Sequence, residues 1–518
     1  MTEIEFKLLV EEAMLPALKR RIGARAEGRG VIRKLRSIYL DTVDQRLAAG
    51  GVALRLRLQG RRWSQTVKRA RRHTAGLSEA DEVTTEAPGG RVALGLLPQA
   101  VRDEIIALKG DLPLAPQFET DMSRTLWTVP LQQGRAEVAL DKGMIRAEGR
   151  EEPLIELEME LLEGSPAHLF DLARAVVTTG PVRLSATNKA TRGRRVADGL
   201  PAVLAPGPRN AVPIILAKGA SVDDATAAIL AECVGQVMTN VTALRASSAP
   251  EGAHQLRVGL RRLRSALMML MPAITGEGGA DLSALAYEAR WLAGEVGGLR
   301  DLQVAEMELV APAAVSYSEE PGFARLGAAL RDRAGETYAT LLATLDGPRA
   351  TAFLLDLAAL VALRGWTAGE GRRDKAQAKR LARPFSKLAR KAVIKAERRV
   401  MKRAVGIETL DHEARHDLRK AMKTLRYTVE FAAPNWPDGH VRGYVKSVKK
   451  VQNLFGTLND AAMGEALFMS DDAPGMDDPA AARAAGRLIG ASLVAADHDW
   501  AQALERWAVF EATPRPWH

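Results

Sequence analysis

The first part of the chain, up to about residue 200, contains short segments in which apolar and polar residues alternate. Alternation with a period of two places apolar side chains on one face of a strand and polar side chains on the other. Two stretches, Glu12–Arg25 and Val101–Leu108, have helical spacing instead. We therefore predict a strand-rich domain, whose clearest strand segments are Ile4–Leu9, Val52–Leu58, Trp63–Lys68, Ala136–Leu140 and Leu154–Leu161.

The pattern changes after a segment rich in proline. Residues 200–214 contain Pro201, Pro206, Pro208 and Pro213, which neither a helix nor a central strand can accommodate. Beyond this segment nearly everything has helical periodicity and a composition rich in Ala, Leu, Arg and Glu. We predict an α+β chain with a strand-rich domain at 1–199, a linker at 200–214 and an all-helical domain at 215–510.

The polar faces of the predicted strands carry clustered charges. Glu3, Glu5 and Lys7 share one face of the first segment, and Arg55 and Arg57 share a face of another. One such strand is ordinarily half-buried with a solvated face. Several strands with like charges at adjacent positions oppose folding unless the charges meet partners. If these faces line a closed barrel, carboxylates can hold divalent cations and Arg and Lys can hold phosphate oxygens.

Seven motifs of this region occur in the order found in CYTH domains, the triphosphate tunnel metalloenzymes. Glu3-Ile-Glu5-Phe-Lys7 resembles the family's E-x-E-x-K signature, and Asn188-Lys189-Ala-Thr-Arg192-Gly193 resembles its closing S-K-x-x-R-G motif. Between them lie Tyr39-Leu-Asp-Thr42, Leu54-Arg55-Leu-Arg57, Trp63-Ser-Gln-Thr-Val-Lys68, Asp141-Lys-Gly143 and Ile155–Leu161. The departures are Leu77–Val83, which lacks the usual aromatic-acidic pattern, Asn188 in place of Ser, and Arg194 where an aromatic is common.

The resemblance implies an eight-stranded antiparallel barrel whose lumen binds triphosphate and hydrolyses it with Mg²⁺ or Mn²⁺. It implies catalytic roles for Glu3, Glu5 and Lys7. The phosphate-binding candidates, with Lys7, are Arg55, Arg57, Lys68, Arg124, Lys189 and Arg192. The metal-binding candidates are Glu3, Glu5, Asp141, Glu156, Glu158 and Glu160, although a carboxylate can also serve only to anchor a lysine. For Arg124 and for Glu137 a structural role is an equal alternative.

The helical part contains a duplicated basic pattern. The two copies align without a gap, and each is followed by a second shared signal, Gly297–Asp301 in one and Gly456–Asp460 in the other. In each copy a His is followed by three cations at helical spacing, so the four side chains fall on one face of a helix. Each copy therefore presents a stripe of like charges, which suits a polyanion. The stripes are His254, Arg257, Arg261 and Arg264 in one copy and His416, Arg419, Lys423 and Arg426 in the other.

These helices resemble the CHAD domain, a duplicated helical bundle associated with polyphosphate. CYTH followed by CHAD is a recurrent pairing of domains. A third basic helix, Arg383–Arg403, has cations four residues apart at Lys387, Lys391, Lys395 and Arg399, which by itself is typical of a solvated face. We expect Asp301 and Asp460 to cap or pair rather than to contact ligand.

The overall composition bears on the partner and the compartment. A formal charge of +10 and a pI near 9.7 favour acidic partners. Aromatic residues make up only 5% of the chain, too few near the stripes to stack bases, so we expect polyphosphate and no specific nucleic acid. With one cysteine, Cys233, and no signal-peptide or membrane-span pattern, we expect a cytoplasmic protein that associates with polyphosphate granules and not with a membrane.

The function that these observations favour is hydrolysis of inorganic triphosphate in the barrel, with polyphosphate bound by the helical domain. The alternatives are a thiamine or nucleoside triphosphatase, an adenylate cyclase, and a polyphosphate-binding scaffold without catalysis.

Overall fold

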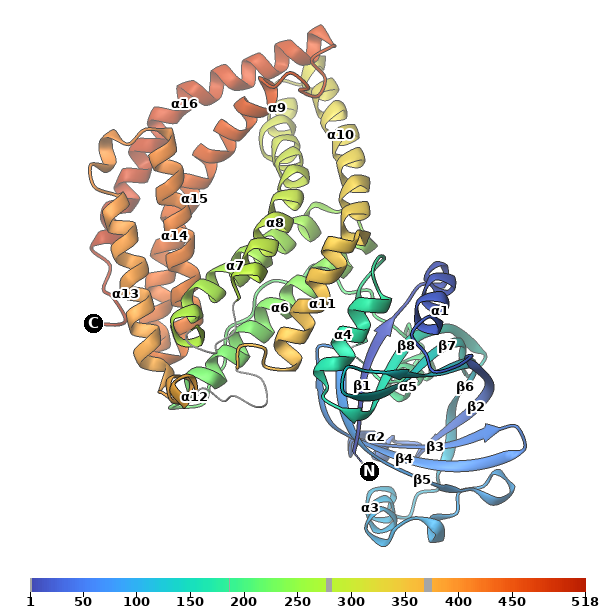
Figure 1. The fold of residues 1–518 in the computed structure, drawn as a ribbon. Coiled ribbons are helices and arrows are strands. Elements are labelled where there is room, and N and C mark those ends of the chain that lie inside the picture. Colours follow the sequence, from blue (N-terminus) through green and yellow to red (C-terminus); the bar gives the residue numbers. More distant parts are fainter. Residues whose placement is uncertain (1, 186, 276–281, 368–374) are drawn as a thin grey trace. The chain divides into compact units, whose positions relative to one another are not determined.

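The computed structural model describes residues 2–185, 187–275, 282–367 and 375–518. The chain divides into two compact units, labelled by element in Figure 1. The first unit consists of residues 1–205 and 345–364, and the second of residues 206–344 and 365–518. The predicted fold class is confirmed, since the first unit is a strand barrel and the second is helical. The grouping of residues 345–364 with the barrel was not among the sequence predictions.

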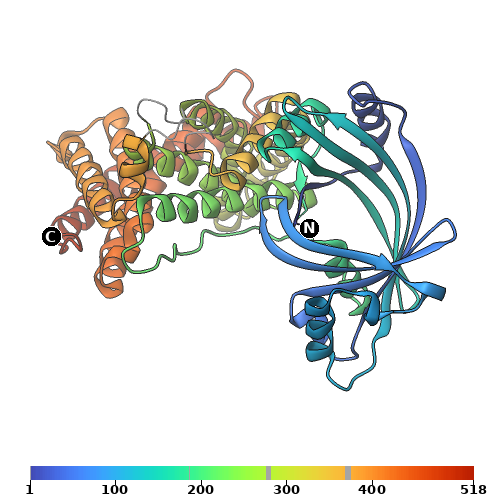
Figure 2. The same cartoon turned by 60° about the horizontal axis from the view of Figure 1, so that its bottom comes forward.

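Eight antiparallel strands close into a barrel, whose curvature around the lumen is visible in Figure 2. Their order is β5-β4-β3-β2-β6-β7-β8-β1, and pairing of β1 with β5 closes the ring. Each predicted strand segment lies within an observed strand, while β2, β5 and β6 were not among the clearest segments. The strands are β1 (Thr2–Leu9), β2 (Val31–Asp41), β3 (Val52–Gln59), β4 (Arg62–Thr74), β5 (Leu77–Glu86), β6 (Ala115–Pro130), β7 (Gly134–Ala147), β8 (Arg150–Gly164) and the short β9 (Arg183–Leu184).

The outward faces of the strands are apolar and are covered by helices. Phe6 of β1 packs against Phe170 of α4 (Ala167–Val176), with the ring centroids 4.5 Å apart. The predicted helical stretch Glu12–Arg25 contains α1 (Leu15–Gly23), and Val101–Leu108 lies within α3 (Gln99–Lys109). The short α2 (Arg46–Ala49) and α11 (Pro348–Ala362) complete the helices of this unit besides α5. Apolar side chains are thus buried between the barrel wall and its covering helices, and charged side chains point into the lumen.

Helix α5 (Lys189–Ala197) packs against the inward faces of β6, β7 and β8 at one end of the barrel. The side chain of Asn188 caps it by accepting a hydrogen bond from the backbone N–H of Thr191. A Cβ atom at Gly193 would lie 2.0 Å from the ring of Phe118, so only glycine permits this close approach. The closing motif of the sequence therefore positions Lys189 and Arg192 beneath the lumen.

The second unit is a set of long helices with an internal duplication. The repeated basic helices are α7 and α14, and the second shared signals lie on the helices that follow them, α8 and α15. Helices α7 and α14 contact each other. The bounds are α6 (Val222–Ala246), α7 (Pro250–Ile274), α8 (Ser283–Val304), η4 (Ala305–Val310), α9 (Ala311–Ser316), α10 (Pro321–Asp346), α12 (Lys375–Leu381), α13 (Phe385–Arg403), α14 (His412–Ala432), α15 (Asp438–Phe468) and α16 (Pro479–Glu511).

Helix α6 is long and apolar enough to cross a membrane by length and composition alone. Just over half of its most apolar window, 56%, is buried within the structure, as in a core helix of a soluble protein. This one helix is weak evidence for a membrane span.

Candidate functional site

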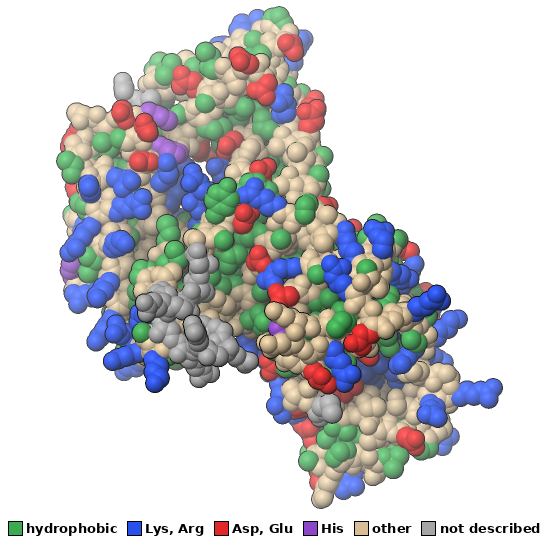
Figure 3. Space-filling view, viewed as in Figure 1, with side chains coloured by type: hydrophobic (Ala, Val, Ile, Leu, Met, Phe, Trp, Pro, Cys, Tyr) green, Lys and Arg blue, Asp and Glu red, His purple; other side chains and the backbone are tan. Residues whose placement is uncertain are grey.

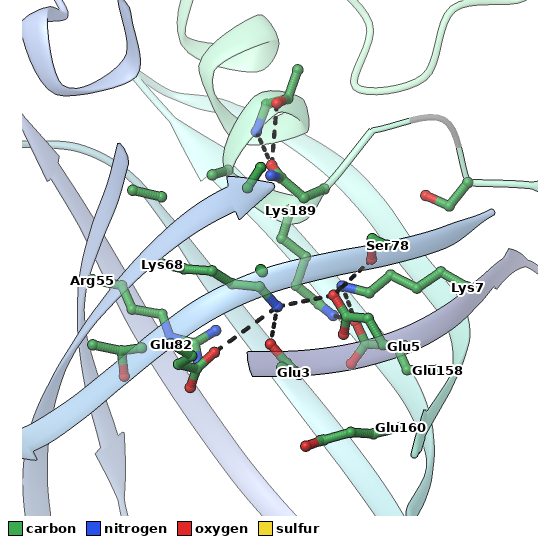
Figure 4. Close-up of a pocket in the computed structure, with 18 of the residues that line it drawn as sticks. Glu3, Glu5, Lys7, Arg55, Lys68, Ser78, Glu82, Glu158, Glu160 and Lys189 are labelled. Atoms are coloured by element: carbon green, nitrogen blue, oxygen red, sulfur yellow. Dashed lines mark hydrogen bonds and ion pairs between the residues drawn. The ribbon is translucent and has the colours of Figure 1, made fainter. Parts of the chain in front are cut away.

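The lumen of the barrel contains a cavity of about 500 Å³. Most of the residues predicted for the site line it, and Figure 4 shows several of them converging from β1, β3, β4, β8 and α5. Asp141, Glu156 and Arg192 are absent from this lining and lie behind it. The predicted residues that do line the cavity are Glu3, Glu5, Lys7, Arg55, Arg57, Lys68, Arg124, Glu158, Glu160 and Lys189.

Behind the lining, carboxylates and cations form a buried layer of ion pairs. Arg124 donates to both oxygens of Asp141 at 2.7 Å, and Lys189 lies 2.9 Å from Asp141 Oδ2. Glu156 pairs with both Lys189 and Arg192. Burial raises the pKa of Asp141, but Lys189 and Arg124 outweigh it and lower this pKa. Oxygens of Asp141, Glu156 and Glu158 lie within 4.8 Å of one another, close enough for one metal ion, but cations already neutralise them.

A row of carboxylates crosses three neighbouring strands on the lumen side. The register places Glu5 of β1 opposite Glu160 of β8, and Glu160 opposite Glu137 of β7. Like charges directly opposite one another destabilise a sheet. Burial, followed by the charges of Glu3 and Glu137, raises the pKa of Glu160 to about 7. This row has an excess of negative charge, which a divalent cation would relieve.

Two lysines border the carboxylate row. Lys7 Nζ lies 2.7 Å from Glu5 Oε1 and 2.9 Å from Glu158 Oε1. Lys68 Nζ lies 2.5 Å from Glu3 Oε2 and 2.9 Å from Glu5 Oε1, as the dashed lines of Figure 4 show. Burial raises the pKa of Glu5, but Lys7 and Lys68 outweigh it and lower this pKa to about 2. Glu5 is therefore ionised at every ordinary pH and holds both ammonium groups in place.

The other side of the cavity has an excess of positive charge. Arg57 of β3 donates from Nε to Ser37 Oγ at 3.1 Å and forms no ion pair with any residue that the structure describes. Burial, followed by the charge of Arg55, lowers the pKa of Arg57 to about 9. Tyr39 lies close to both arginines, which lower the pKa of its phenol against the effect of burial. An anion bound here would remove the repulsion between the arginines.

The sequence predictions missed several residues of the cavity. Glu82 of β5 lies 3.5 Å from Arg55 and 3.9 Å from Lys68. The sequence feature that could have predicted Glu82 is its alternation with Ser78 and Ala80. This feature lies in the segment that departs from the family pattern. Other lining residues outside the prediction are Arg33, Tyr39 and Arg194, while Glu137, left open between two roles, also lines the cavity.

In the helical unit, α7 and α14 bring cations of both stripes together. We call Arg257, Arg261, Arg419, Lys423 and Arg426 the cation cluster. Burial, followed by the charges of Arg261 and Arg419, lowers the pKa of Lys423 to about 6. The Nε atoms of Arg261, Arg419 and Arg426 are buried without a hydrogen-bond partner among the described residues. Arg257 pairs with Asp301 and Arg426 with Glu430, whereas the other three cations form no ion pair with a residue that the structure describes.

The remaining stripe residues lie in different surroundings. Burial, followed by the charge of Arg300, lowers the pKa of His254. Arg264 has Arg290 as its charged neighbour, which together with burial lowers its pKa. His416 Nδ1 lies 2.8 Å from Asn459 Oδ1, so the second shared signal orients this ring. The expected pairing role of Asp301 is observed, because its Oδ1 accepts a hydrogen bond from Arg257 at 2.9 Å.

Two domain families match the chain. Residues 1–193 match the CYTH domain, and residues 228–468 match the CHAD domain. The inorganic triphosphatase of Haemophilus influenzae is 32% identical over 167 residues, which make up 31% of this chain and 45% of that protein. This chain thus spans less than half the length of that relative. The crystal structure of the CHAD domain from the plant Ricinus communis is 25% identical, with a TM-score of 0.51, and covers 60% of this chain and 98% of that one.

Proposed function

With a CYTH domain in residues 1–193 and a CHAD domain in residues 228–468, the chain belongs to both families, and on this premise we propose that its barrel hydrolyses inorganic triphosphate. The similarity to the Haemophilus inorganic triphosphatase supports this reaction. The observation that carries the proposal is the division of charge across one cavity. Arg55 and Arg57 lie on one side and the carboxylates of Glu3, Glu5 and Glu160 lie on the other.

The carboxylates that line the lumen offer the oxygen ligands that a divalent cation takes, but those of Glu3, Glu5 and Glu160 do not approach one another as closely as those of Asp141, Glu156 and Glu158 do. Glu3, Glu5 and Glu160 line the cavity, and the pKa values of Glu3 and Glu160 are raised by burial and by neighbouring carboxylates. Mg²⁺ and Mn²⁺ take oxygen ligands, so we propose that these three residues hold the ion. Such an ion supplies Lewis-acid stabilisation of charge on the phosphate oxygens. Asp141 and Glu156 are fully buried, at 0% exposure, and we propose that they anchor Lys189, Arg124 and Arg192 instead.

The chain's own side chains supply binding and positioning. The guanidinium groups of Arg55 and Arg57 bind the oxygens of one phosphate. Lys189, whose Nζ already pairs with three carboxylates, adds positive charge beside the lumen. Lys7 and Lys68 have excess hydrogen-bonding capacity beyond their ion pairs, so they reach phosphate without moving far. Charge stabilisation by groups already in place is the main source of catalysis in phosphoryl transfer.

Phosphate release from a panel of substrates tests the proposal. Tripolyphosphate, ATP, thiamine triphosphate and long polyphosphate are compared with Mg²⁺, with Mn²⁺ and in chelator. We expect tripolyphosphate to give the highest kcat/KM, and turnover to disappear in chelator and return with added ion. Preference for ATP or thiamine triphosphate would favour the alternative substrates, and turnover that survives chelation would overturn the metal assignment.

For the helical unit we propose binding of polyphosphate. The support is the cation cluster, in which burial, followed by the charges of cations from two helices, lowers the pKa values of Arg261, Arg419 and Lys423. A phosphate polymer supplies negative charge at regular spacing and needs no base stacking, whereas single-stranded nucleic acid does. We propose the cytoplasm as its location. Displacement of labelled polyphosphate by single-stranded DNA or RNA tests the choice, since equal displacement at matched phosphate would indicate a general polyanion binder.

A further inference from the structure

The helical unit contains a second cavity, of about 400 Å³, between η4, α14, α15 and α16. We call it the helical cavity. Most of its apolar lining comes from η4, α15 and α16, which also contribute Glu308, Glu465 and Asp499, and α14 supplies a basic wall. A volume of this size is typical of a small-molecule site. The apolar lining includes Leu309, Phe455, Leu458, Leu488, Leu493 and Trp500, and the α14 lining consists of His412, Arg415, His416 and Arg419.

Planar groups are layered at the wall of this cavity. The rings of Phe455 and Trp500 are stacked, with centroids 5.6 Å apart and planes 18° apart. The guanidinium carbon of Arg415 lies 3.9 Å from the centroid of the Trp500 ring. Trp500 is 6% exposed, and its Nε1 is buried without a hydrogen-bond partner among the residues that the structure describes. A flat ligand in the cavity would extend this layer.

Arg419 joins the helical cavity to the cation cluster. It lines the cavity, and it is also an electrostatic neighbour of Arg257, Arg261 and Lys423. Its Nε atom is buried without a described hydrogen-bond partner. A ligand that follows the cluster with phosphates and ends in a flat ring can therefore reach both regions at once.

We propose that the helical cavity binds the base of a nucleoside polyphosphate whose phosphates lie on Arg419 and the cation cluster. This rests on the proposed polyphosphate binding of the helical unit and adds a second ligand class to it. Asp499 and Glu465 also line the cavity and offer acceptors to the amino groups of a base. A hydrocarbon chain would desolvate these carboxylates without hydrogen bonding to them, which disfavours a lipid.

Displacement of labelled long polyphosphate from the full chain tests this proposal. The competitors are adenosine tetraphosphate and inorganic tetraphosphate, which have equal numbers of phosphates. Electrostatics alone favours the inorganic competitor, because the nucleoside carries less negative charge. We expect adenosine tetraphosphate to be about tenfold more effective, as stacking of one base is worth about 1–3 kcal/mol.

Two neighbouring residues of α16 provide matched variants. Leu493 lines the cavity and is 60% exposed, whereas Val494 is 83% exposed and does not line it. We expect Leu493→Glu to remove the advantage of the nucleoside by crowding its base in the cavity, and Val494→Glu to leave this advantage unchanged. Both variants should bind inorganic polyphosphate within about twofold of wild type, since each adds one exposed charge outside the cluster. Trp500→Leu, which keeps an apolar side chain, should reduce the advantage as well.

The outcomes distinguish this proposal from the proposed binding of polyphosphate by the helical unit. If labelled polyphosphate does not bind at all, the proposed function of the helical unit fails. If it binds but the two tetraphosphates compete equally, or Leu493→Glu and Val494→Glu behave alike, the base site is overturned. Equal competition by a single-stranded oligonucleotide at matched phosphate would overturn the assignment to free nucleotides.

Discussion

The barrel lumen and the cation cluster both concentrate Lys and Arg, but they balance this charge in opposite ways. In the lumen, Lys7 lies between Glu5 and Glu158, and these carboxylates raise its pKa well above the usual value despite burial. In the helical unit, Lys423 lies among arginines, and its pKa falls to about 6. Lys7 is buried and Lys423 is half-buried, and the two lysines have opposite electrostatic surroundings.

This difference indicates that carboxylates position the lumen cations, whereas the cations of the cluster attract an anion. The cations of the lumen are held in place by carboxylates before any ligand arrives, which is the preorganisation that catalysis requires. The cation cluster has uncompensated positive charge until an anion binds. The free energy of anion binding therefore includes the relief of repulsion among these cations. We therefore propose that the lumen acts on a short phosphate chain and that the cluster holds one.

The largest effect is expected where the lumen's positioning is broken. Glu5→Gln or Lys7→Ala should lower the turnover of tripolyphosphate by at least about 100-fold, because each removes a charge that orients its neighbours. Initial rates of phosphate release measure this, with circular dichroism to confirm folding. Glu163→Gln, on the exposed end of β8 and paired with Arg135, is the control and should retain full activity. A Glu5 or Lys7 variant that keeps half of the wild-type rate would refute the active-site assignment.

Arg57 allows the comparison to be made within the lumen. Like the cations of the cluster, it lies beside another cation, and its pKa is lowered. Its pKa is lowered to about 9 by burial and by Arg55, so its charge destabilises the ligand-free protein. Arg57→Met should raise KM for tripolyphosphate about tenfold or more, while Tm rises by about 2–4 °C for each 1 kcal/mol of repulsion removed. Kinetics and thermal melts without substrate measure both. A fall in Tm with unchanged KM would show that Arg57 is structural.

In the helical unit, removal of charge should weaken binding without affecting catalysis. Arg419→Gln with Lys423→Gln should reduce polyphosphate affinity about tenfold and flatten its salt dependence, because fewer counterions are released. The full chain is the right material, since α11 groups with the barrel unit. Binding titrations at several salt concentrations measure the slope, and tripolyphosphate turnover should stay at the wild-type level. An unchanged slope would refute the cluster as the binding surface.

The strands of the lumen were predictable because their pattern is local. Alternation of Glu3, Glu5 and Lys7 with apolar residues requires only a period of two, and β1 has it throughout. The register between strands is not local. That Glu160 lies opposite both Glu5 and Glu137 follows from how β1, β7 and β8 pair, which no single segment encodes.

The helical unit shows the same limit. The duplicated stripes were readable from their spacing, and the structure brings Arg257, Arg261 and Lys423 together. Few aromatic residues lie near these stripes in the sequence. Trp500 reaches the end of the cluster only through the packing of α16 against α15, far along the chain. Periodicity predicts faces of helices, whereas tertiary packing decides which faces meet.

A smaller effect is expected from pH. Because the pKa of Lys423 is lowered to about 6, this lysine is neutral above that pH in the ligand-free protein, and binding of a polyanion must restore its proton. Affinity should therefore be highest below pH 6 and fall as pH rises, by at most about tenfold per unit. The groups that act on Lys423 are Arg257 and Arg261 from α7, Arg419 from α14 and Asp460 from α15. Lys423→Arg should bind tightly across this range, and a wild-type affinity that does not vary with pH would contradict the buried lysine.

The smallest effect is expected on the third basic helix, α13. Figure 3 shows Lys and Arg side chains gathered over the region of α13 and α14, and Lys387, Lys391 and Lys395 are exposed. Exposed cations are screened by salt and interact weakly, with a Debye length of about 8 Å at physiological ionic strength. Lys391→Gln with Lys395→Gln should therefore change polyphosphate affinity by less than about twofold at that ionic strength. Measured below pH 6, where Lys423 is protonated, the double change removes as much charge as Arg419→Gln with Lys423→Gln, so the two pairs compare position and not net charge. If both pairs weaken binding equally, the total charge of the surface decides affinity, and the contrast between a buried cluster and a solvated helix face is wrong.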